Sequence, residues 1–410
     1  METVRRSSAY QALLVGLLSL NFGILFFDRN ALNFLMPFVQ PDLKLSNFQV
    51  GMLGAALSLT WAISGYLIGR YSDRTGHRKS IIVVAGIAFS ICSFVSGLAA
   101  SFMMLLGARL LMGFAEGGVL PISQSLTASE VSPEKRGLAM GVMQNLGSNT
   151  LGSAIAPLVL VPIALAYSWR EAFYVAAIPG LISAVLIWFL IKDSAAPVAG
   201  QAQERLSVKQ AFAERNILIC AMIAVLLIAY LVICWGFMPI YLTQMRGFDP
   251  DTMSWLMATL GISAGIGSFV VPAISDYVGR KPVMILIPLI GVILPLSAMF
   301  FHGPTWMLAV IFFFGWALNG VFPMFMATIP SETVDPKHTA TVLGLVMGTG
   351  EILGGVFGPL AAGKVADLTN LNAPMWIMLG LTIVAGLLAL GLRETAPRAL
   401  ARSTNRTSFT

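Results

Sequence analysis

Residues 69–79 read GRYSDRTGHRK, and part of this stretch returns in the second half of the chain. The segment SDRTG at 72–76 recurs as SDYVG at 275–279, which is 203 residues further on in a chain of 410. A second set recurs at nearly the same offset: Gly113, Gly118, Pro121, Ser129 and Glu130 return as Gly315, Gly320, Pro323, Ser331 and Glu332. A recurrence near half of the chain length, kept over several segments, indicates an internal duplication.

The composition is that of a membrane protein. Hydrophobic residues make up 57% of the chain and charged residues 11%, with a mean hydropathy of +0.82. Soluble proteins carry about 25% charged residues, so this composition excludes most soluble enzymes, nucleic-acid-binding proteins and secreted disulfide-bonded domains. The three cysteines lie in apolar runs and the three histidines near expected loops. We therefore expect no metal site and no cofactor.

Twelve apolar runs, each of about 20 residues or more, are long enough to cross a bilayer. They predict an all-α membrane protein with twelve transmembrane helices in two six-helix halves. The spans are expected at 10–38, 49–69, 80–99, 102–128, 137–164, 171–191, 216–243, 252–274, 282–301, 306–329, 339–363 and 374–392. One long polar connection, 192–215, separates an N-terminal half (1–191) from a C-terminal half (216–392), and residues 204–215 within it suit a short surface helix. Residues 393–410 form a tail. Duplicated helical halves are typical of transporters, whose substrate site lies where the halves meet.

The distribution of lysine and arginine predicts the orientation of the chain. Of the 25 such residues, Arg29 and Arg109 lie inside spans, and Lys44, Arg170, Arg246 and Lys364 fall on one side. The other 19 fall on the opposite side, so both termini are expected in the cytoplasm. Loops this short suit a bacterial inner membrane.

Five ionisable residues lie within the predicted spans: Asp28, Arg29, Arg109, Glu116 and Glu351. Each costs at least about 2.5 kcal/mol at the centre of a bilayer, so they should face the protein interior or a wet cavity. Arg109 and Glu116 are seven residues apart and share a helix face, as do Asn21 and Asp28. Two interpretations are open. The charges bind a ligand and protons, or Asp28 with Arg109 and Glu116 with Arg29 simply neutralise one another.

The stretch at 69–79 closely resembles the loop 2–3 signature of the major facilitator superfamily, G-x-x-x-D-[RK]-x-G-x-[RK]-[RK]. The copy beginning at Asp276 is degenerate. The resemblance implies the major facilitator fold and a conformational latch, formed by Asp73, Arg74, Gly76 and Arg78 and, in the second half, by Asp276. The alternative is an ordinary cytoplasmic turn whose basic residues only follow the charge bias.

A narrower resemblance is carried by Phe27-Asp28-Arg29 and by Arg109-x-x-x-Gly113-x-x-Glu116-Gly117. These motifs look like those of the anion:cation symporter family, which includes bacterial sugar-acid transporters, sialin and the vesicular glutamate transporters. The resemblance implies that Arg29 grips a substrate carboxylate. It also implies that Asp28 and Glu116 carry protons, while Arg109 tunes them.

Further substrate-binding candidates are Arg109 and the polar or aromatic residues at cavity positions: Asn33, Ser148, Asn149, Trp235, Tyr241 and Asn319. The aromatic members can also be anchors at the membrane interface. Glu351 falls at the repeat position of Ser148, where the family resemblance leads us to expect a neutral residue. It is therefore a substrate contact, a second proton site, or a side chain folded toward a neighbouring helix.

The sequence thus predicts a monomeric, proton-coupled symporter of a small organic anion, such as a sugar acid or carboxylate, working by alternating access in a lipid bilayer. A proton-coupled antiporter that exports a cationic or zwitterionic drug-like compound is the alternative, which Glu351 keeps open. A channel or membrane sensor is a third class, which the duplicated motif speaks against. The sequence contains no phosphate-binding G-x-x-x-x-G-K-[ST] motif. Direct use of ATP and enzymatic activity are therefore not expected.

Overall fold

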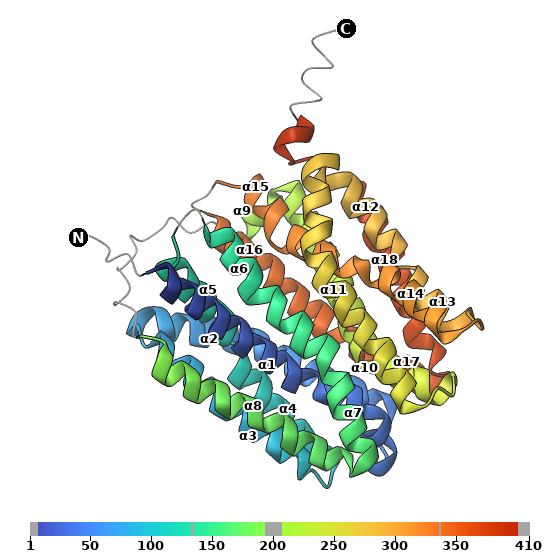
Figure 1. The fold of residues 1–410 in the computed structure, drawn as a ribbon. Helices are drawn as coiled ribbons and strands as arrows, with labels where there is room; N and C mark the ends of the chain where they lie inside the picture. Colours follow the sequence, from blue (N-terminus) through green and yellow to red (C-terminus); the bar gives the residue numbers. More distant parts are fainter. Residues whose placement is uncertain (1–6, 133–134, 193–206, 336–337, 401–410) are drawn as a thin grey trace. The chain divides into compact units, whose positions relative to one another are not determined.

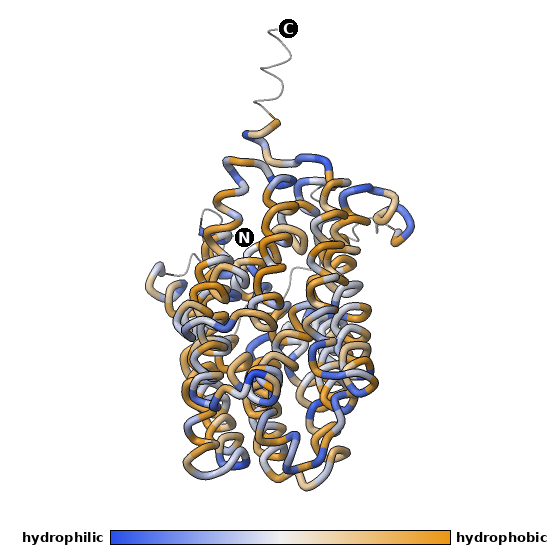
Figure 2. Tube along the Cα trace, turned by 90° about the vertical axis from the view of Figure 1, so that its right-hand side faces the viewer, coloured by the Kyte–Doolittle hydropathy of each residue, from blue (hydrophilic) through white to orange (hydrophobic). Residues whose placement is uncertain are grey.

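In the computed structural model, the described residues are 7–132, 135–192, 207–335 and 338–400, and they are almost entirely helical (Figure 1). Within these ranges twelve helical stretches are long and apolar enough to cross a membrane, which confirms the predicted fold class. Hydrophobic residues dominate along the helices, and hydrophilic residues collect at the turns that connect them (Figure 2). Residues 193–206 of the predicted linker and 401–410 of the predicted tail lie outside the described residues, as do Arg5, Arg6, Arg205, Lys337, Arg402 and Arg406 of the charge count.

The chain forms two compact units, one of residues 1–200 with 247–261 and the other of residues 201–246 with 262–410. The spans before the linker are α1 (Ser8–Asp42), α2 (Asn47–Thr75), α3 (Arg78–Gly97), α4 (Phe102–Glu116) with α5 (Val119–Glu130), α6 (Arg136–Gly141) with η2 (Val142–Leu146), η3 (Ser148–Ile155) and α7 (Ala156–Ala166), and α8 (Trp169–Leu190). The predicted surface helix is the short α9 (Val208–Ala213).

The spans after the linker follow the same plan. They are α10 (Arg215–Ile240) with η4 (Tyr241–Met245), α11 (Pro250–Val278), α12 (Arg280–Ile290) with α13 (Ile293–Phe300), α14 (Thr305–Gly315) with η5 (Trp316–Val321), η6 (Met324–Thr328) and α15 (Ile329–Thr333), α16 (Thr339–Thr349) with η8 (Gly350–Val356) and α17 (Phe357–Leu368), and α18 (Asn372–Ala389).

The second span is longer than the predicted 49–69, so most of the signature stretch belongs to a helix rather than to a loop. Asp73 and Arg74 lie in the last turns of α2, which ends at Thr75. Gly76 closes the helix in the left-handed conformation, with φ of 73°, which a residue with a side chain adopts at a cost. The hydrophobicity of 49–69 predicted the membrane-embedded part, whereas the polar turns of α2 continue beyond it.

In the first unit, α1 packs very closely against the π-helical part of the fifth span. A Cβ on Gly147 would lie 1.9 Å from the carbonyl oxygen of Ser19, and one on Gly23 would lie 2.7 Å from that of Gly147. The Ser19 hydroxyl donates to the Val142 carbonyl at 2.9 Å and accepts from the Gly147 amide at 3.2 Å. Ser19 therefore bonds to backbone groups of the distorted segment, and glycine allows it to come close enough.

Replacing Gly147 with alanine tests this contact. Because the added methyl group would overlap the α1 backbone, we expect Gly147→Ala to cost about 1–3 kcal/mol of stability. The check is a lower midpoint of thermal unfolding of the detergent-purified protein. Gly137→Ala is the matched control in the same span, since nothing lies within 4 Å of its added Cβ, and it should be neutral or stabilising. Equal midpoints for the two variants would contradict the close contact.

Candidate functional site

Four of the five predicted membrane charges lie together in the first unit, on α1 and α4. Asp28 and Glu116 are fully buried, and Arg109 is 2% exposed. Arg29 is half-buried. These residues are near enough to interact electrostatically, Asp28 with Glu116 and Arg109, and Glu116 with both arginines. The structure thus brings together the residues for which the sequence predicted a common role.

Two glycines on α4 allow it to pack closely against α2, and this packing positions Glu116. A Cβ on Gly113 would lie 2.4 Å from the carbonyl oxygen of Leu57, and one on Gly117 would lie 2.3 Å from that of Trp61. Glycine at both positions lets the two backbones approach. Glu116 lies between these two glycines in the sequence.

Arg109 connects α4 to α1. Its Nη1 donates to the backbone carbonyl of Arg29 at 3.0 Å and to the sulfur of Met112 at 3.4 Å. Its guanidinium carbon lies 5.9 Å from the centre of the Phe173 ring on α8. Nε and Nη2 are buried and have no hydrogen-bonding partner among the described residues. The Arg109 side chain is therefore hydrogen-bonded through Nη1 alone, and its Nε and Nη2 donors have no partner among the described residues.

The two buried carboxylates are not paired with the arginines by direct contact. All four oxygen atoms of Asp28 and Glu116 are buried without a hydrogen-bonding partner in the part of the chain that the structure describes. No ion pair between described residues joins them to Arg29 or Arg109. Simple mutual neutralisation would place the charges in contact to offset their burial. This geometry therefore disfavours that interpretation.

Arg29 offers its guanidinium group to a ligand. The guanidinium carbon lies 5.5 Å from the ring centres of both Phe26 and Trp61. No described residue accepts a hydrogen bond from its side chain. Aromatic rings can hold a guanidinium by cation–π attraction without occupying its donors, and these donors suit a carboxylate bidentately.

The other candidates of the first unit are already engaged within it. The Asn33 amide donates to the side chain of Asn30 at 3.4 Å, and the Asn30 amide donates to the Gly152 carbonyl at 2.9 Å. The Ser148 hydroxyl donates to the Gln144 carbonyl of its own helix at 2.6 Å. Asn149 is half-buried in η3. Of these residues, Asn149 is the one whose side-chain amide makes no hydrogen bond with a described residue.

In the second unit, the predicted aromatic residues belong to a buried cluster. Trp235 packs edge-on against Trp316 at 5.4 Å between ring centres, and Trp316 stacks on Tyr230 at 5.8 Å. Tyr241 is 2% exposed and donates to Asn372 at 2.9 Å. These side chains are therefore packing residues of the second unit, and burial argues against the interpretation as interface anchors.

The two polar candidates of the second unit lie on distorted segments. Asn319 is half-buried in η5, and Glu351 is half-buried at the start of the π-helical η8. Its repeat counterpart Ser148 begins η3. Both halves therefore carry a π-helical distortion at the same place, and such distortions are frequent at functional sites.

Two tryptophans with buried indole nitrogens were not among the predicted site residues. Trp61 holds Arg29, and Trp316 stacks in the aromatic cluster; neither Nε1 has a hydrogen-bonding partner among the described residues. Both lie in the middle of a span, whereas anchoring tryptophans gather near the ends. Their position in the sequence could therefore have identified these two tryptophans as candidate site residues.

The predicted latch residues differ between the two copies. In the first, Asp73 is exposed and makes no hydrogen bond or ion pair with any described residue. Arg74 is also exposed, and the buried Nε of Arg78 has no partner among these residues. Asp73 lines a pocket of about 350 Å³ together with Gly69, Ser72, Pro121, Ile122, Gln124, Ser125, Ala128 and Met140. Gly76 has a structural role as the residue that ends α2.

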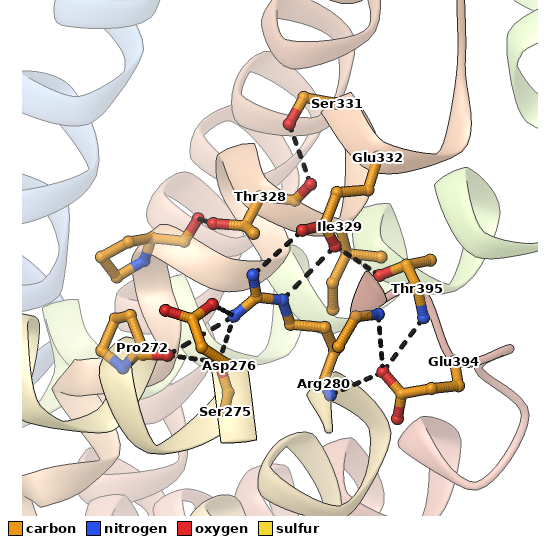
Figure 3. Close-up of polar contacts among 12 residues, drawn as sticks. Pro272, Ser275, Asp276, Arg280, Thr328, Ile329, Ser331, Glu332, Glu394 and Thr395 are labelled. Atoms are coloured by element: carbon orange, nitrogen blue, oxygen red, sulfur yellow. Dashed lines mark hydrogen bonds and ion pairs between the residues drawn. The ribbon is translucent and has the colours of Figure 1, made fainter. Parts of the chain in front are cut away.

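In the second copy, the corresponding region is filled by Arg280. Its guanidinium pairs with Asp276 at 2.6 Å and with Glu332 at 2.9 Å (Figure 3). Glu394, beyond the last span, accepts from the backbone amides of Arg280 at 2.7 Å and Lys281 at 3.1 Å, and so caps the start of α12. Asp276 is thus one part of a larger ionic network that the sequence did not reveal.

Comparisons with known proteins agree with this architecture. A family model described as Major Facilitator Superfamily matches residues 18–248 and 221–409. The hexuronate transporter of Bacillus subtilis (strain 168) is 31% identical over 273 residues, 62% of this chain and 62% of the relative. A probable 4-methylmuconolactone transporter of Cupriavidus pinatubonensis is 30% identical over 342 residues, 80% of this chain and 78% of the relative.

A solved structure is similar in fold. The crystal structure of a bacterial homologue of the human lysosomal transporter Spinster matches with a TM-score of 0.74 at 18% identity. The match covers 94% of this chain and 96% of that chain.

The Arg280 network makes a prediction about stability. Arg280 is 6% exposed, so Glu332→Gln would leave part of a buried guanidinium charge uncompensated. We expect a loss of about 1.5–3 kcal/mol, the usual worth of a hydrogen bond to a charged group, because Asp276 still pairs with Arg280. Thermal unfolding of the purified protein measures it, with Glu171→Gln at an exposed position as the control. An unchanged midpoint for Glu332→Gln would show that the pair does not stabilise the second unit.

Proposed function

Because the chain belongs to the major facilitator superfamily, we propose that it is a secondary transporter that carries a small organic anion together with protons by alternating access. The family and the matched relatives are transporters, so the chain is a multi-pass membrane transporter and not an enzyme. Proton coupling, a bacterial inner membrane, cytoplasmic termini and a monomeric state belong to the proposal.

One observation carries the choice of substrate. The guanidinium carbon of Arg29 lies 5.5 Å from the ring centres of both Phe26 and Trp61, and its side chain has no acceptor among the described residues. A carboxylate is the natural partner for such a group. The named substrates of the two relatives, a hexuronate and a methylmuconolactone, are compact organic acids or their lactones. We accordingly assign this chain a small carboxylate, with sugar acids as the first class to test.

The buried carboxylates supply a means of coupling. A carboxyl group buried beside an arginine can be held in either protonation state, depending on whether burial or the arginine dominates. Glu116 lies within electrostatic reach of both Arg29 and Arg109. Ionised Glu116 and the substrate carboxylate therefore compete for Arg29. A proton on Glu116 frees Arg29 for the substrate, and loss of that proton favours release. Asp28 exchanges protons with Glu116, while Arg109 fixes the distance between α1 and α4.

The proposed set of substrate-binding residues also includes four residues of the second unit. Asn319 and Glu351 are proposed as polar contacts for the substrate, and Trp235 and Tyr241 as aromatic residues. Glu351 also supports a second candidate function, the export of a cationic or zwitterionic compound, because an acidic group attracts such a compound. Uptake of a sugar acid would exclude an exporter of cations as the main activity. In either function, Asp73 with Arg74 and Arg78 acts as a latch that is made and broken during the cycle, as Asp276 does in the second half.

The first functional prediction concerns Glu116. In proteoliposomes, Glu116→Gln should abolish accumulation of D-glucuronate driven by a proton gradient, because the amide cannot release a proton. Exchange of labelled for unlabelled D-glucuronate without a gradient should persist. If the variant still concentrates the acid against its gradient, Glu116 is not the coupling residue.

The second functional prediction concerns Arg29. Arg29→Lys keeps the charge but loses the planar pair of donors, so the affinity for D-glucuronate should fall by about tenfold to a hundredfold. Equilibrium binding to the purified protein measures it. Arg170→Lys, at the ion pair with Asp42 (2.9 Å), serves as the control and should bind normally. Wild-type affinity in Arg29→Lys would remove Arg29 as the carboxylate-binding group.

A further inference from the structure

A row of buried polar side chains follows the contact between α1, α3 and α8 in the first unit. Its members are Asn21 on α1, Ser90 and Ser93 on α3, and Ser183 on α8, and none is more than 2% exposed. Ser90 and Ser93 are one helical turn apart and share a face of α3. We call these four residues the polar row.

Three contacts place the members of the row near one another. The Ser183 hydroxyl donates to the Asn21 side-chain oxygen at 2.8 Å. One turn earlier on α8, a Cβ on Gly180 would lie 2.1 Å from the Ser90 hydroxyl oxygen, so α3 and α8 nearly touch there. Ser93 lies beside the Asp28 carboxylate while its hydroxyl donates to the Phe173 carbonyl at 3.5 Å. The row therefore leads from Asp28 toward the N-terminal part of α1.

Helix packing alone accounts for only part of the row. Serines that bond to carbonyls of their own helix are common at helix contacts, and Ser90 does so with Gly86 at 2.9 Å. Asn21 is different, because its Nδ2 is fully buried and has no hydrogen-bonding partner among the described residues. Burying an amide donor without an acceptor destabilises the fold. It lies seven residues, about 10 Å, before Asp28 on the same face of α1.

We propose that the polar row is part of the path by which protons pass between Asp28 and the N-terminal end of α1, separately from the substrate at Arg29. The inference rests on the proposed proton coupling. It assigns Asn21, Ser90, Ser93 and Ser183 as positioning residues for proton transfer. The N-terminal end of α1 is the expected cytoplasmic side, so this path serves release into the cell.

Each hydroxyl in the row gains one proton and loses one during the transfer, so it is unchanged at the end. The Asp28 carboxylic acid gives its proton to the oxygen of a neighbouring hydroxyl or solvent water, which passes its own proton onward, and Asp28 is left as a carboxylate. Asn21 does not ionise. Its oxygen accepts a hydrogen bond from Ser183, and its Nδ2, which has no partner among the described residues, supplies the donor that the proposed path requires. The charged groups near Asp28 from the packed helices are Arg109 and Glu116 on α4, and they set the balance between its two forms.

The experiment compares two serines of one helix in the full-length protein. Ser90 and Ser96 are both buried on α3, and both donate to the carbonyl four residues earlier, at 2.9 and 2.8 Å. They lie on opposite sides of Ser93, and Ser96 is outside the row. Proteoliposomes containing a pH-sensitive dye report proton movement driven by D-glucuronate, and exchange of the labelled acid without a gradient reports substrate movement alone.

We expect Ser90→Ala and Asn21→Leu to slow proton-coupled uptake about fivefold or more, as the loss of a hydrogen bond in the path would. Exchange should stay at the wild-type rate, and Ser96→Ala should match the wild type in both assays. Equal slowing of uptake and exchange would show a structural role instead. Equal effects of Ser90→Ala and Ser96→Ala, or wild-type uptake in Asn21→Leu, would also overturn the path. If the wild type carries D-glucuronate without moving protons, the proposed coupling itself is wrong.

Discussion

The hydrogen bond from Arg109 on α4 to the backbone carbonyl of Arg29 on α1 is the contact on which the first unit depends. It fixes the separation of the two helices that carry all four charges of the site. Because the acceptor is a backbone atom, the guanidinium of Arg29 remains available while its place in the chain is held. It also leaves the carboxylates of Asp28 and Glu116 without direct contact to an arginine, so their charge balance can respond to a proton or to a second anion. A direct salt bridge at the same positions would resist that response.

The two halves of the duplicated chain use their signature segments differently. In the second unit, Arg280 occupies the space between Asp276 and Glu332. The repeat position of Arg280 in the first half is His77, which is exposed, and Asp73 there lines a pocket. The duplication thus kept a glycine with positive φ at both positions, Gly76 and Gly279, although their ψ angles of −3° and 151° differ. The polar partners diverged, which leaves one copy with a formed ionic network and the other with an aspartate available to a different partner.

The sequence predicts the fold well, because hydrophobicity and length decide which segments enter a bilayer. It predicts the charged site equally directly, since Asp28, Arg29, Arg109 and Glu116 stand out against an apolar background. It does not predict what depends on packing between distant helices. Trp61 beside Arg29, the contact of Ser183 with Asn21, and the capping of α12 by Glu394 join residues that are far apart in the chain. Trp235 and Tyr241 have the right chemistry for a ligand, but their neighbours bury them.

The four charged residues differ in burial, and this difference matches the two roles proposed for them, substrate recognition and proton coupling. Arg29 is the half-buried member, and its surroundings are the rings of Phe26 and Trp61. Asp28, Glu116 and Arg109 have almost no exposed surface. In the proposed function, a change in the shape of the acid would alter contacts around Arg29, whereas the buried carboxylates would sense the substrate through its charge on Arg29. Coulombic interactions in a poorly polarisable interior act over several ångströms without contact. Under this proposal, acids of different shape would be coupled to protons by the same buried residues, provided that each presents a carboxylate to Arg29.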